Sequence, residues 1–269
     1  FENTWNKNGY RILAGFGYEY ARFQAITYNE LVIAGNPTTI DVTSNFDIHK
    51  GAAFAQVSKS YFGEKLDVSL GLRSDIANYS KNMLNPLNQL SPSLSLSYNI
   101  TNQFALSTNV SRYNQLPSYT ILGYRDQNGV LKNKENNLKY IQADHFVFGG
   151  SYVTGFDAKF SIEGFWKNYR YYPFSVSDSI SLANLGSDFG IVGNEEVSSN
   201  SNGRAYGIEF LYQQKLIKGF YALLAYTYVT SEFEDKFGNY VPSTWDSKHI
   251  VSLTGGKRFK KGWEVGFRW

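Results

Sequence analysis

Apolar and polar residues alternate along most of this chain, and residues 202–233 show the pattern most clearly. One parity in the first half of this stretch is apolar and aromatic, with Tyr206, Ile208, Phe210 and Tyr212. The other parity carries Gly207, Glu209, Gln213 and Lys215. Successive side chains of a β-strand point to opposite faces, so this alternation predicts a strand with one apolar and one polar face. A short turn at residues 217–219 joins it to a second strand, which predicts a long β-hairpin.

The same period of two recurs along the whole chain and predicts about eleven strands. They cover residues 10–28, 46–61, 66–75, 93–99, 104–114, 142–153, 157–172, 202–216, 220–233, 248–258 and 263–269. Residues 1–5 come before the turn dipeptide Asn8-Gly9 and look like the tail of a further strand.

The predicted connections alternate between short and long. The short ones are residues 62–65, 101–103, 154–155, 217–219 and 259–262, and the long ones are residues 29–45, 81–88, 115–141, 173–202 and 234–246. Loops beyond about 12–15 residues are uncommon in compact domains, and a soluble sandwich has no reason to place its long loops at one end. Outer-membrane barrels do so, with short periplasmic turns and long extracellular loops. The pattern predicts an all-β, antiparallel, up-and-down transmembrane barrel in the bacterial outer membrane.

Composition narrows the function classes. Aromatic residues make up 17% of the chain, which suits the aromatic girdles of a barrel. No apolar run approaches the roughly 20 residues of a transmembrane helix. The absence of cysteine excludes disulfides and thiolate metal sites, and we expect neither a metal nor a cofactor. A net charge of +3 without a basic cluster argues against nucleic acid as a partner.

Catalysis has little support in the sequence. The nearest serine–histidine pair is His249 and Ser252, but residues three apart on a strand face opposite sides. Asp246 near His249 is the one arrangement reminiscent of a barrel protease, and no clear pair of carboxylates accompanies it. We therefore expect no catalytic residues and no enzymatic activity.

Closure of the sheet sets the domain organisation. Single-chain bacterial barrels close with an even number of strands, and an open sheet cannot span lipid because its edge groups lack partners. The expected organisation is thus a partial barrel domain over residues 1–269, with other strands outside this chain. Two alternatives stay open: a complete smaller barrel acting as a passive porin, adhesin or barrel enzyme, and a soluble β-sandwich module.

Three stretches resemble TonB-dependent outer-membrane receptors. Residues 53–75 end in the Gly-x-Arg-x-Asp pattern of Gly71, Arg73 and Asp75. Residues 90–124 are similar to the family's next hairpin, with Gln115-Leu-Pro where the chain leaves the membrane. Residues 202–233 contain a Gly-Ile-Glu strand followed by a Tyr-Thr-Tyr strand. The style of the loops resembles receptors of Bacteroidetes-type bacteria.

The resemblance implies a 22-stranded barrel closed by an N-terminal plug, of which this chain would supply part of the C-terminal half of the barrel. The plug, the first barrel strands and the last strands would lie outside the chain. The implied function is TonB-dependent import of a nutrient, namely a siderophore or iron chelate, cobalamin or a glycan. The implied partners are outer-membrane lipid and lipopolysaccharide, the nutrient, and TonB–ExbB–ExbD through the N-terminal part. A surface lipoprotein partner stays open.

The resemblance also implies site residues. Plug arginines in the family pair with two lumenal barrel glutamates, and Glu209 matches one of them. The other position falls on Val147, which departs from the pattern, and lumenal Glu163 is a candidate substitute. Arg73 and Asp75 are further lumenal candidates for contact with a plug or solute. Beyond the membrane, the candidate solute contacts are Tyr119, Tyr124, Arg125 and Trp245. The competing interpretation is that the lumenal charges hydrate the barrel wall and the loop residues anchor the loops.

Overall fold

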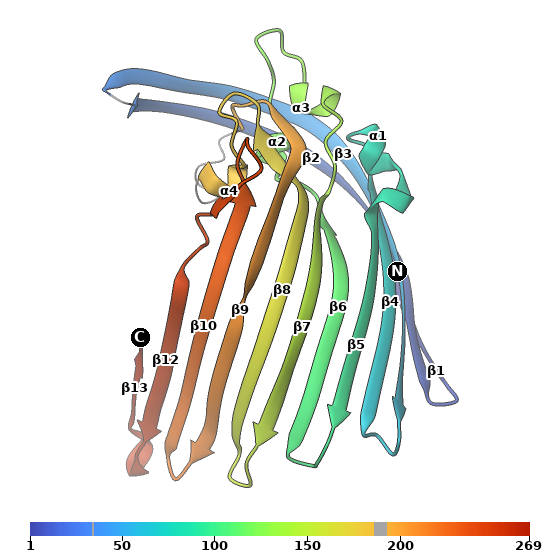
Figure 1. The fold of residues 1–269 in the computed structure, drawn as a ribbon, viewed down its shortest axis with the longest axis vertical. Coiled ribbons are helices and arrows are strands. Elements are labelled where there is room, and N and C mark those ends of the chain that lie inside the picture. Colours follow the sequence, from blue (N-terminus) through green and yellow to red (C-terminus); the bar gives the residue numbers. More distant parts are fainter. Residues whose placement is uncertain (34, 186–192) are drawn as a thin grey trace.

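The computed structural model describes residues 1–33, 35–185 and 193–269. These residues form one antiparallel sheet of 13 strands, in which almost every strand pairs with its neighbours in the chain (Figure 1). The strands are β1 (Glu2–Lys7), β2 (Tyr10–Ile33), β3 (Asn36–Tyr61), β4 (Leu66–Ala77), β5 (Leu90–Asn99), β6 (Phe104–Gln115), β7 (Ile141–Val153), β8 (Ala158–Ser175), β9 (Val197–Ile217), β10 (Phe220–Glu234), β11 (Tyr240–Pro242), β12 (Lys248–Arg258) and β13 (Glu264–Arg268). Short helices lie between them: α1 (Lys81–Leu84), η1 (Pro86–Gln89), α2 (Tyr119–Leu122), α3 (Lys132–Glu135), α4 (Leu182–Leu185) and η3 (Lys260–Gly262).

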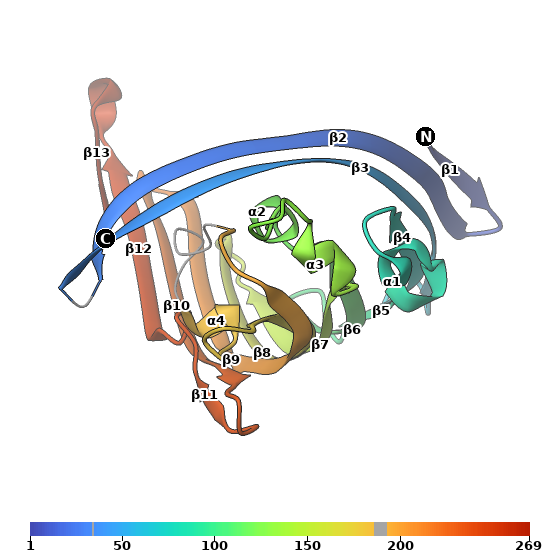
Figure 2. The same ribbon diagram turned by 90° about the horizontal axis from the view of Figure 1, so that it is seen from above.

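The sheet curves into the wall of an open barrel, and helices α2 and α3 lie on its concave side (Figure 2). Strand order runs from β1 to β13 without a crossover, and within the described residues these two end strands do not pair with each other. The predicted up-and-down antiparallel barrel sheet is confirmed, and it is not closed by this chain alone. No helix of the described residues is long and apolar enough to span a membrane.

Short and long connections lie at opposite ends of the sheet, which we call the turn end and the loop end (Figure 1). The turn end includes residues 62–65, 154–157 and 218–219, where turns were predicted at 62–65, 154–155 and 217–219. Lys218 and Gly219 both have positive φ, 48° and 86°, the backbone that a two-residue hairpin needs. A Cβ on Gly219 would lie 2.4 Å from the carbonyl oxygen of Arg258, so a side chain is excluded there as well.

The prediction of a loop over residues 29–45 is wrong. Strand β2 continues to Ile33 and strand β3 begins at Asn36, with Tyr28 opposite Asp41 and Ile33 opposite Asn36. The resulting hairpin bends across the loop end and arches over the concave side of the sheet (Figures 1 and 2). Projecting hairpins face water on both sides, so their strands need no apolar alternation and polar composition does not distinguish them from loops.

The strand count also differs from the prediction. The tail predicted at residues 1–5 is a strand, β1, and the three-residue β11 pairs with β10 where a loop was predicted. Strands β8 and β9 likewise reach Ser175 and Val197, inside the predicted loop over residues 173–202. Strands therefore rise further into the loop end than the apolar pattern indicates.

The two faces of the sheet differ in polarity. A row of apolar and aromatic residues crosses five strands in register on the convex face: Leu94, Val110, Phe146, Trp166 and Tyr206. Phe146 and Trp166 are 51% and 42% exposed, which in a water-soluble monomer would form a continuous apolar patch. In an outer-membrane barrel, this face meets lipid.

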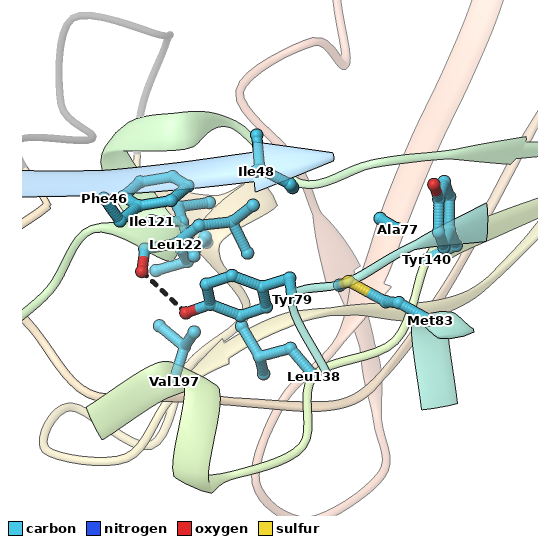
Figure 3. Packing of buried hydrophobic residues seen from close by; sticks show 11 residues of the cluster. Phe46, Ile48, Ala77, Tyr79, Met83, Ile121, Leu122, Leu138, Tyr140 and Val197 are labelled. Carbon is cyan, nitrogen blue, oxygen red and sulfur yellow. Dashed lines mark hydrogen bonds between the residues drawn. The ribbon is translucent and has the colours of Figure 1, made fainter. Parts of the chain in front are cut away.

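Buried apolar residues gather at the loop end (Figure 3). In a soluble protein such a core would instead lie against one face of the sheet. We call this cluster the loop core; it consists of Phe46, Ile48, Ala77, Tyr79, Met83, Ile121, Leu122, Leu138, Tyr140, Leu182 and Val197. Its members come from β3, β4, β9, helices α1, α2 and α4, and the segments beside them. The loops are therefore packed against one another and against the wall.

Candidate ligand face and loop core

Glu163 and Glu209 lie directly opposite each other on β8 and β9. Both belong to the concave face, where Glu163 lines a hollow together with His145 and Val147. Gly149 makes room for Glu163, because a Cβ there would lie 2.5 Å from the Glu163 Cγ. The register thus places Glu163, Glu209 and Val147 on the same concave face, and contact of the two carboxylates with a plug stays a prediction.

The two glutamates have no ion-pair partner in the described part of the chain, whose salt bridges involve other residues. Like charges directly opposite each other on neighbouring strands are destabilising. A cationic partner from outside this chain would relieve the repulsion and gain two charge-assisted hydrogen bonds. The pair can thus serve as an anionic receptor for arginine or lysine side chains.

Arg73 and Asp75 form a closed ion pair on the concave face. The guanidinium donates from Nε at 2.8 Å and from Nη2 at 2.6 Å to the two carboxylate oxygens. A second pair, Lys50 with Glu19 at 2.8 Å, lines the same hollow, as does Tyr140. Because each charge already has a partner, this part of the wall is polar but neutral, unlike the two glutamates.

Tyr119 and Arg125 hold the loop over residues 116–140 against β3. The ring of Tyr119 packs edge-on against Phe46 with 5.9 Å between centroids. Arg125 donates from Nη2 to the carbonyl oxygen of Asn45 at 2.6 Å and from Nη1 to that of Gly129 at 2.6 Å. The structure thus gives both residues an anchoring contact, and their contact with a solute stays a prediction.

Tyr124 and Trp245 lie less tightly at the loop end. Trp245 is 42% exposed and contacts Phe233 and Tyr172, each with 6.5 Å between ring centroids. The main chain of Tyr124 accepts a hydrogen bond from the amide of Lys132 at 3.1 Å, while its side chain is half-exposed. Trp245 thus leaves part of its ring open to a solute, and contact of either residue with a solute stays a prediction.

Asn133 joins three segments of the loop core and was not singled out in the sequence. Its side chain is fully buried; Nδ2 donates to the carbonyl oxygens of Ile121 and Glu195 at 2.7 and 3.2 Å. Its Oδ1 accepts from the amide of Val197 at 2.8 Å. The chain around it, Lys-Asn-Lys-Glu, is highly charged and gives no sign of burial, so only the spatial neighbours reveal its role.

Tyr79 stabilises the same core through its hydroxyl, which donates to the carbonyl oxygen of Leu122 at 2.6 Å (Figure 3). Tyr79→Phe is expected to destabilise the packing of α2 by about 1–2 kcal/mol, because the buried carbonyl loses its partner. Burial raises the pKa of the Tyr79 hydroxyl, so it stays protonated and the effect should be the same at pH values of about 6 and about 9. Hydrogen exchange of residues 119–123 would measure it.

The exposed Tyr240→Phe is the matched control and should leave this exchange unchanged. Exchange rates in Tyr79→Phe equal to those of the wild type would show that the hydroxyl does not hold α2.

The arrangement considered for catalysis does not assemble. His249 Nδ1 lies 2.9 Å from the Tyr226 hydroxyl. Asp246 instead accepts from the amide of Ser231 at 2.9 Å and pairs with Lys248 at 3.0 Å. Within residues 1–33, 35–185 and 193–269, no three histidine, cysteine, aspartate or glutamate side chains gather to hold a metal.

The structure therefore combines an open up-and-down sheet, a lipid-type convex face, a polar concave face and packed loops at one end. A family model described as TonB dependent receptor-like, beta-barrel, matches residues 1–269. The chain belongs to the TonB-dependent receptor family. Members of this family are transport receptors of the outer membrane, so the predicted family, its class as a transport receptor rather than an enzyme, and the outer-membrane location are confirmed. Which end of the sheet faces the periplasm stays a prediction. The Bacteroidetes-type origin stays a prediction.

Solved receptors share the fold at low sequence identity. The ferric-catecholate import receptor Fiu from E. coli K12 aligns with a TM-score of 0.67 at 11% identity, over 98% of this chain and 42% of that receptor. The copper transporter OprC aligns with a TM-score of 0.64 at 15% identity, over 98% and 41%. The alcaligin outer-membrane receptor FauA from Bordetella pertussis gives 0.59 at 14% identity, over 99% and 44%.

The chain thus spans about two fifths of the length of these receptors. A search of curated proteins found no match. The solved structures establish the architecture, and what each of them transports is a property of that receptor.

Proposed function

We propose that this TonB-dependent receptor barrel belongs to an importer of a scarce nutrient, energised through TonB–ExbB–ExbD by parts of the protein outside this chain. The observation that carries the proposal is the pair Glu163 and Glu209, two opposed carboxylates on the concave face without a cationic partner among the described residues. A passive pore needs no such pair, whereas a plug with arginine side chains would neutralise it. The 22-stranded barrel with an N-terminal plug is part of the same proposal.

An iron chelate is the solute class that we favour over cobalamin or a glycan. Fiu and FauA are described as receptors for a ferric catecholate and for alcaligin, and both share the fold. The loop end also offers partly exposed aromatic rings, Tyr124 and Trp245, which suit contact with a flat aromatic chelate. Arg73, Asp75, Tyr119 and Arg125 would support these contacts by holding the wall and loops in place.

Growth of a deletion strain tests the solute class. The strain should lose growth on one or a few ferric siderophores as sole iron source and regain it with the full-length gene. A gene deleted for the segment that binds TonB should not restore growth. Normal growth of the deletion strain on every iron chelate, combined with a defect on cobalamin or a glycan, would contradict the iron proposal but not active import. Restoration without TonB would contradict import by this route.

Orientation is a separate proposal: the turn end faces the periplasm and the loop end faces the outside. The chain contains no cysteine, so single cysteines give a clean label. Asn128 is exposed in a long loop, and Asn102 is exposed in a short turn. Intact cells treated with a membrane-impermeant maleimide should label Asn128→Cys strongly and Asn102→Cys only after lysis. Labelling in the reverse order would overturn the orientation.

A further inference from the structure

Three cationic side chains line one pocket at the loop end, and two of them belong to strands of the wall. Arg112, Lys139 and Arg170 line a pocket of about 250 Å³. Strand alternation places Arg112 on the face of Val110, which is the lipid-type face and not the lumen. Charged side chains on this face are costly at the bilayer centre and are tolerated close to the interface. Three of them around one hollow therefore call for an explanation.

Asp144 neutralises only part of this charge. Arg112 donates to its two carboxylate oxygens at 2.6 and 3.0 Å, and Arg170 donates to one of them at 2.5 Å. Lys139 has no carboxylate partner among the described residues, and its ammonium lies 4.2 Å from the centroid of the Tyr171 ring. Three cations and one anion leave an excess of about two positive charges at the pocket. An anion with two charges would balance it.

The backbone of β8 is distorted in a way that serves this pocket. The register against β9 shifts between Tyr169 and Tyr172, and Tyr171 has a φ of 59°. Bulky residues rarely adopt this left-handed conformation, and such strain is frequent at functional sites. Its effect is that two consecutive residues, Arg170 and Tyr171, both line the pocket.

A buried amide completes the pocket from the other side. Gln89, at the end of η1, is 1% exposed and lines the pocket together with Asn82. Its Nε2 donates to the carbonyl oxygen of Asn82 at 2.9 Å, while its Oε1 has no hydrogen-bond partner. A buried acceptor without a partner is costly, so a donor from a ligand, such as a hydroxyl group, would stabilise it.

The polar pocket continues into an apolar hollow of the same face. Arg112 lines both, and the second hollow, of about 640 Å³, is bordered by Leu94, Val110, Phe146 and Trp166. Cations at the rim above an apolar strip match an amphiphile with an anionic head and hydrocarbon chains. Guanidinium groups bind phosphate through paired hydrogen bonds, which favours phosphate as the anion.

We propose that this pocket binds the phosphorylated sugar head of a glycolipid in the outer leaflet, with its acyl chains along the apolar hollow. The phosphate lies against Arg112, Arg170 and Lys139, and a sugar hydroxyl donates to Oε1 of Gln89. The proposal rests on the orientation proposed above, since the loop end must face the outer leaflet, and is independent of the transported solute. The proposal assigns one defined lipid site on the convex face, in addition to the general contact of this face with membrane lipid.

Lipid binding to the full-length, delipidated receptor in detergent tests the site by native mass spectrometry. Bisphosphorylated lipid A should bind, and its dephosphorylated form should bind roughly tenfold or more weakly, as expected for the loss of hydrogen bonds to charged groups. The variant Lys139→Gln/Arg170→Gln should show a similar loss for lipid A. It leaves the Arg112–Asp144 pair in place, and heat-modifiable gel mobility confirms folding.

Arg204→Gln is the matched control. Arg204 lies on the same face and pairs with Glu232 at 2.8 Å, so that pair is neutral, and Arg204 does not line the pocket. The affinity of this variant for lipid A should stay within about twofold of the wild type. That difference is well below the tenfold loss, about 1.4 kcal/mol, expected of the double variant. Equal losses in Arg204→Gln and in the double variant would mean diffuse attraction and would overturn the site.

A second variant and a competitor keep the test decisive. Gln89→Glu places an anion in the pocket without removing a cation, so a folded protein should lose lipid A binding. Unchanged binding in this variant overturns the proposal, as does displacement of lipid A by millimolar inorganic phosphate, which would indicate a site for free phosphate. Because these measurements are made in detergent, a reversed orientation in the cysteine experiment would be recognised separately from failure of the site.

Discussion

Replacing Asn133 with alanine is expected to loosen the loop core and expose residues 116–140 and 193–197 to exchange and proteolysis. The side chain makes three hydrogen bonds in a fully buried position, to Ile121, Glu195 and Val197. Each buried group left without its partner costs about 1–3 kcal/mol, and the three losses act together on neighbouring segments. The expected local destabilisation is therefore several kcal/mol, among the largest of any single change at the loop end.

Hydrogen exchange of the full-length receptor measures this directly, with the Val197 amide as the most sensitive reporter. Asn133→Asp keeps an acceptor for that amide but loses both donated bonds, so it should give an intermediate effect. Asn128→Ala, in an exposed part of the same loop, is the control and should behave as the wild type. If Asn133→Ala and Asn128→Ala exchange alike, Asn133 does not hold the loops together.

The hairpin formed by β9 and β10 shows what the sequence can predict. Its alternation, its short turn at Lys218-Gly219 and the pairing of both strands were all predicted and are confirmed. Lipid imposes an apolar face on every strand that crosses it, so the pattern is strong wherever a strand spans the bilayer. Outside the bilayer this requirement ends, so the apolar pattern does not distinguish the paired residues 29–33 of β2 and 36–45 of β3 from a loop.

Loop contacts depend on partners distant in the chain. Arg125 donates to Asn45, 80 residues away, and Asn133 accepts from Val197, 64 residues away. No local sequence pattern indicates such bonds, so the sequence alone does not distinguish solute contact from loop anchoring for Arg125. The convex-face cluster around Asp144 was missed for a different reason: a few charges within an apolar parity look like interruptions of a strand until the register places them side by side.

Glu163→Gln/Glu209→Gln is expected to raise the passive permeability of the full-length receptor. Under the proposed function, the two opposed carboxylates receive cationic side chains of the plug, and the double variant removes both charges while keeping the shape of the side chains. Charge-assisted hydrogen bonds contribute about 1.5–3 kcal/mol each, and every 1.4 kcal/mol corresponds to a tenfold shift in population. A rise of roughly tenfold or more in the open population is expected, measured as ion conductance in planar bilayers and as sensitivity to large antibiotics.

Asp67→Asn is the matched control, because Asp67 also lies on the concave face and accepts from the hydroxyl of Ser60, a bond that asparagine can keep. It should leave permeability unchanged, whereas Glu209→Gln alone should give a partial increase. The direction of the change in permeability and heat resistance distinguishes two roles of the glutamate pair. Without a plug, removing either charge relieves repulsion between neighbouring strands and tightens the wall. Wild-type conductance in the double variant, together with a more heat-resistant barrel, would therefore mean that the glutamates only hydrate the lumen.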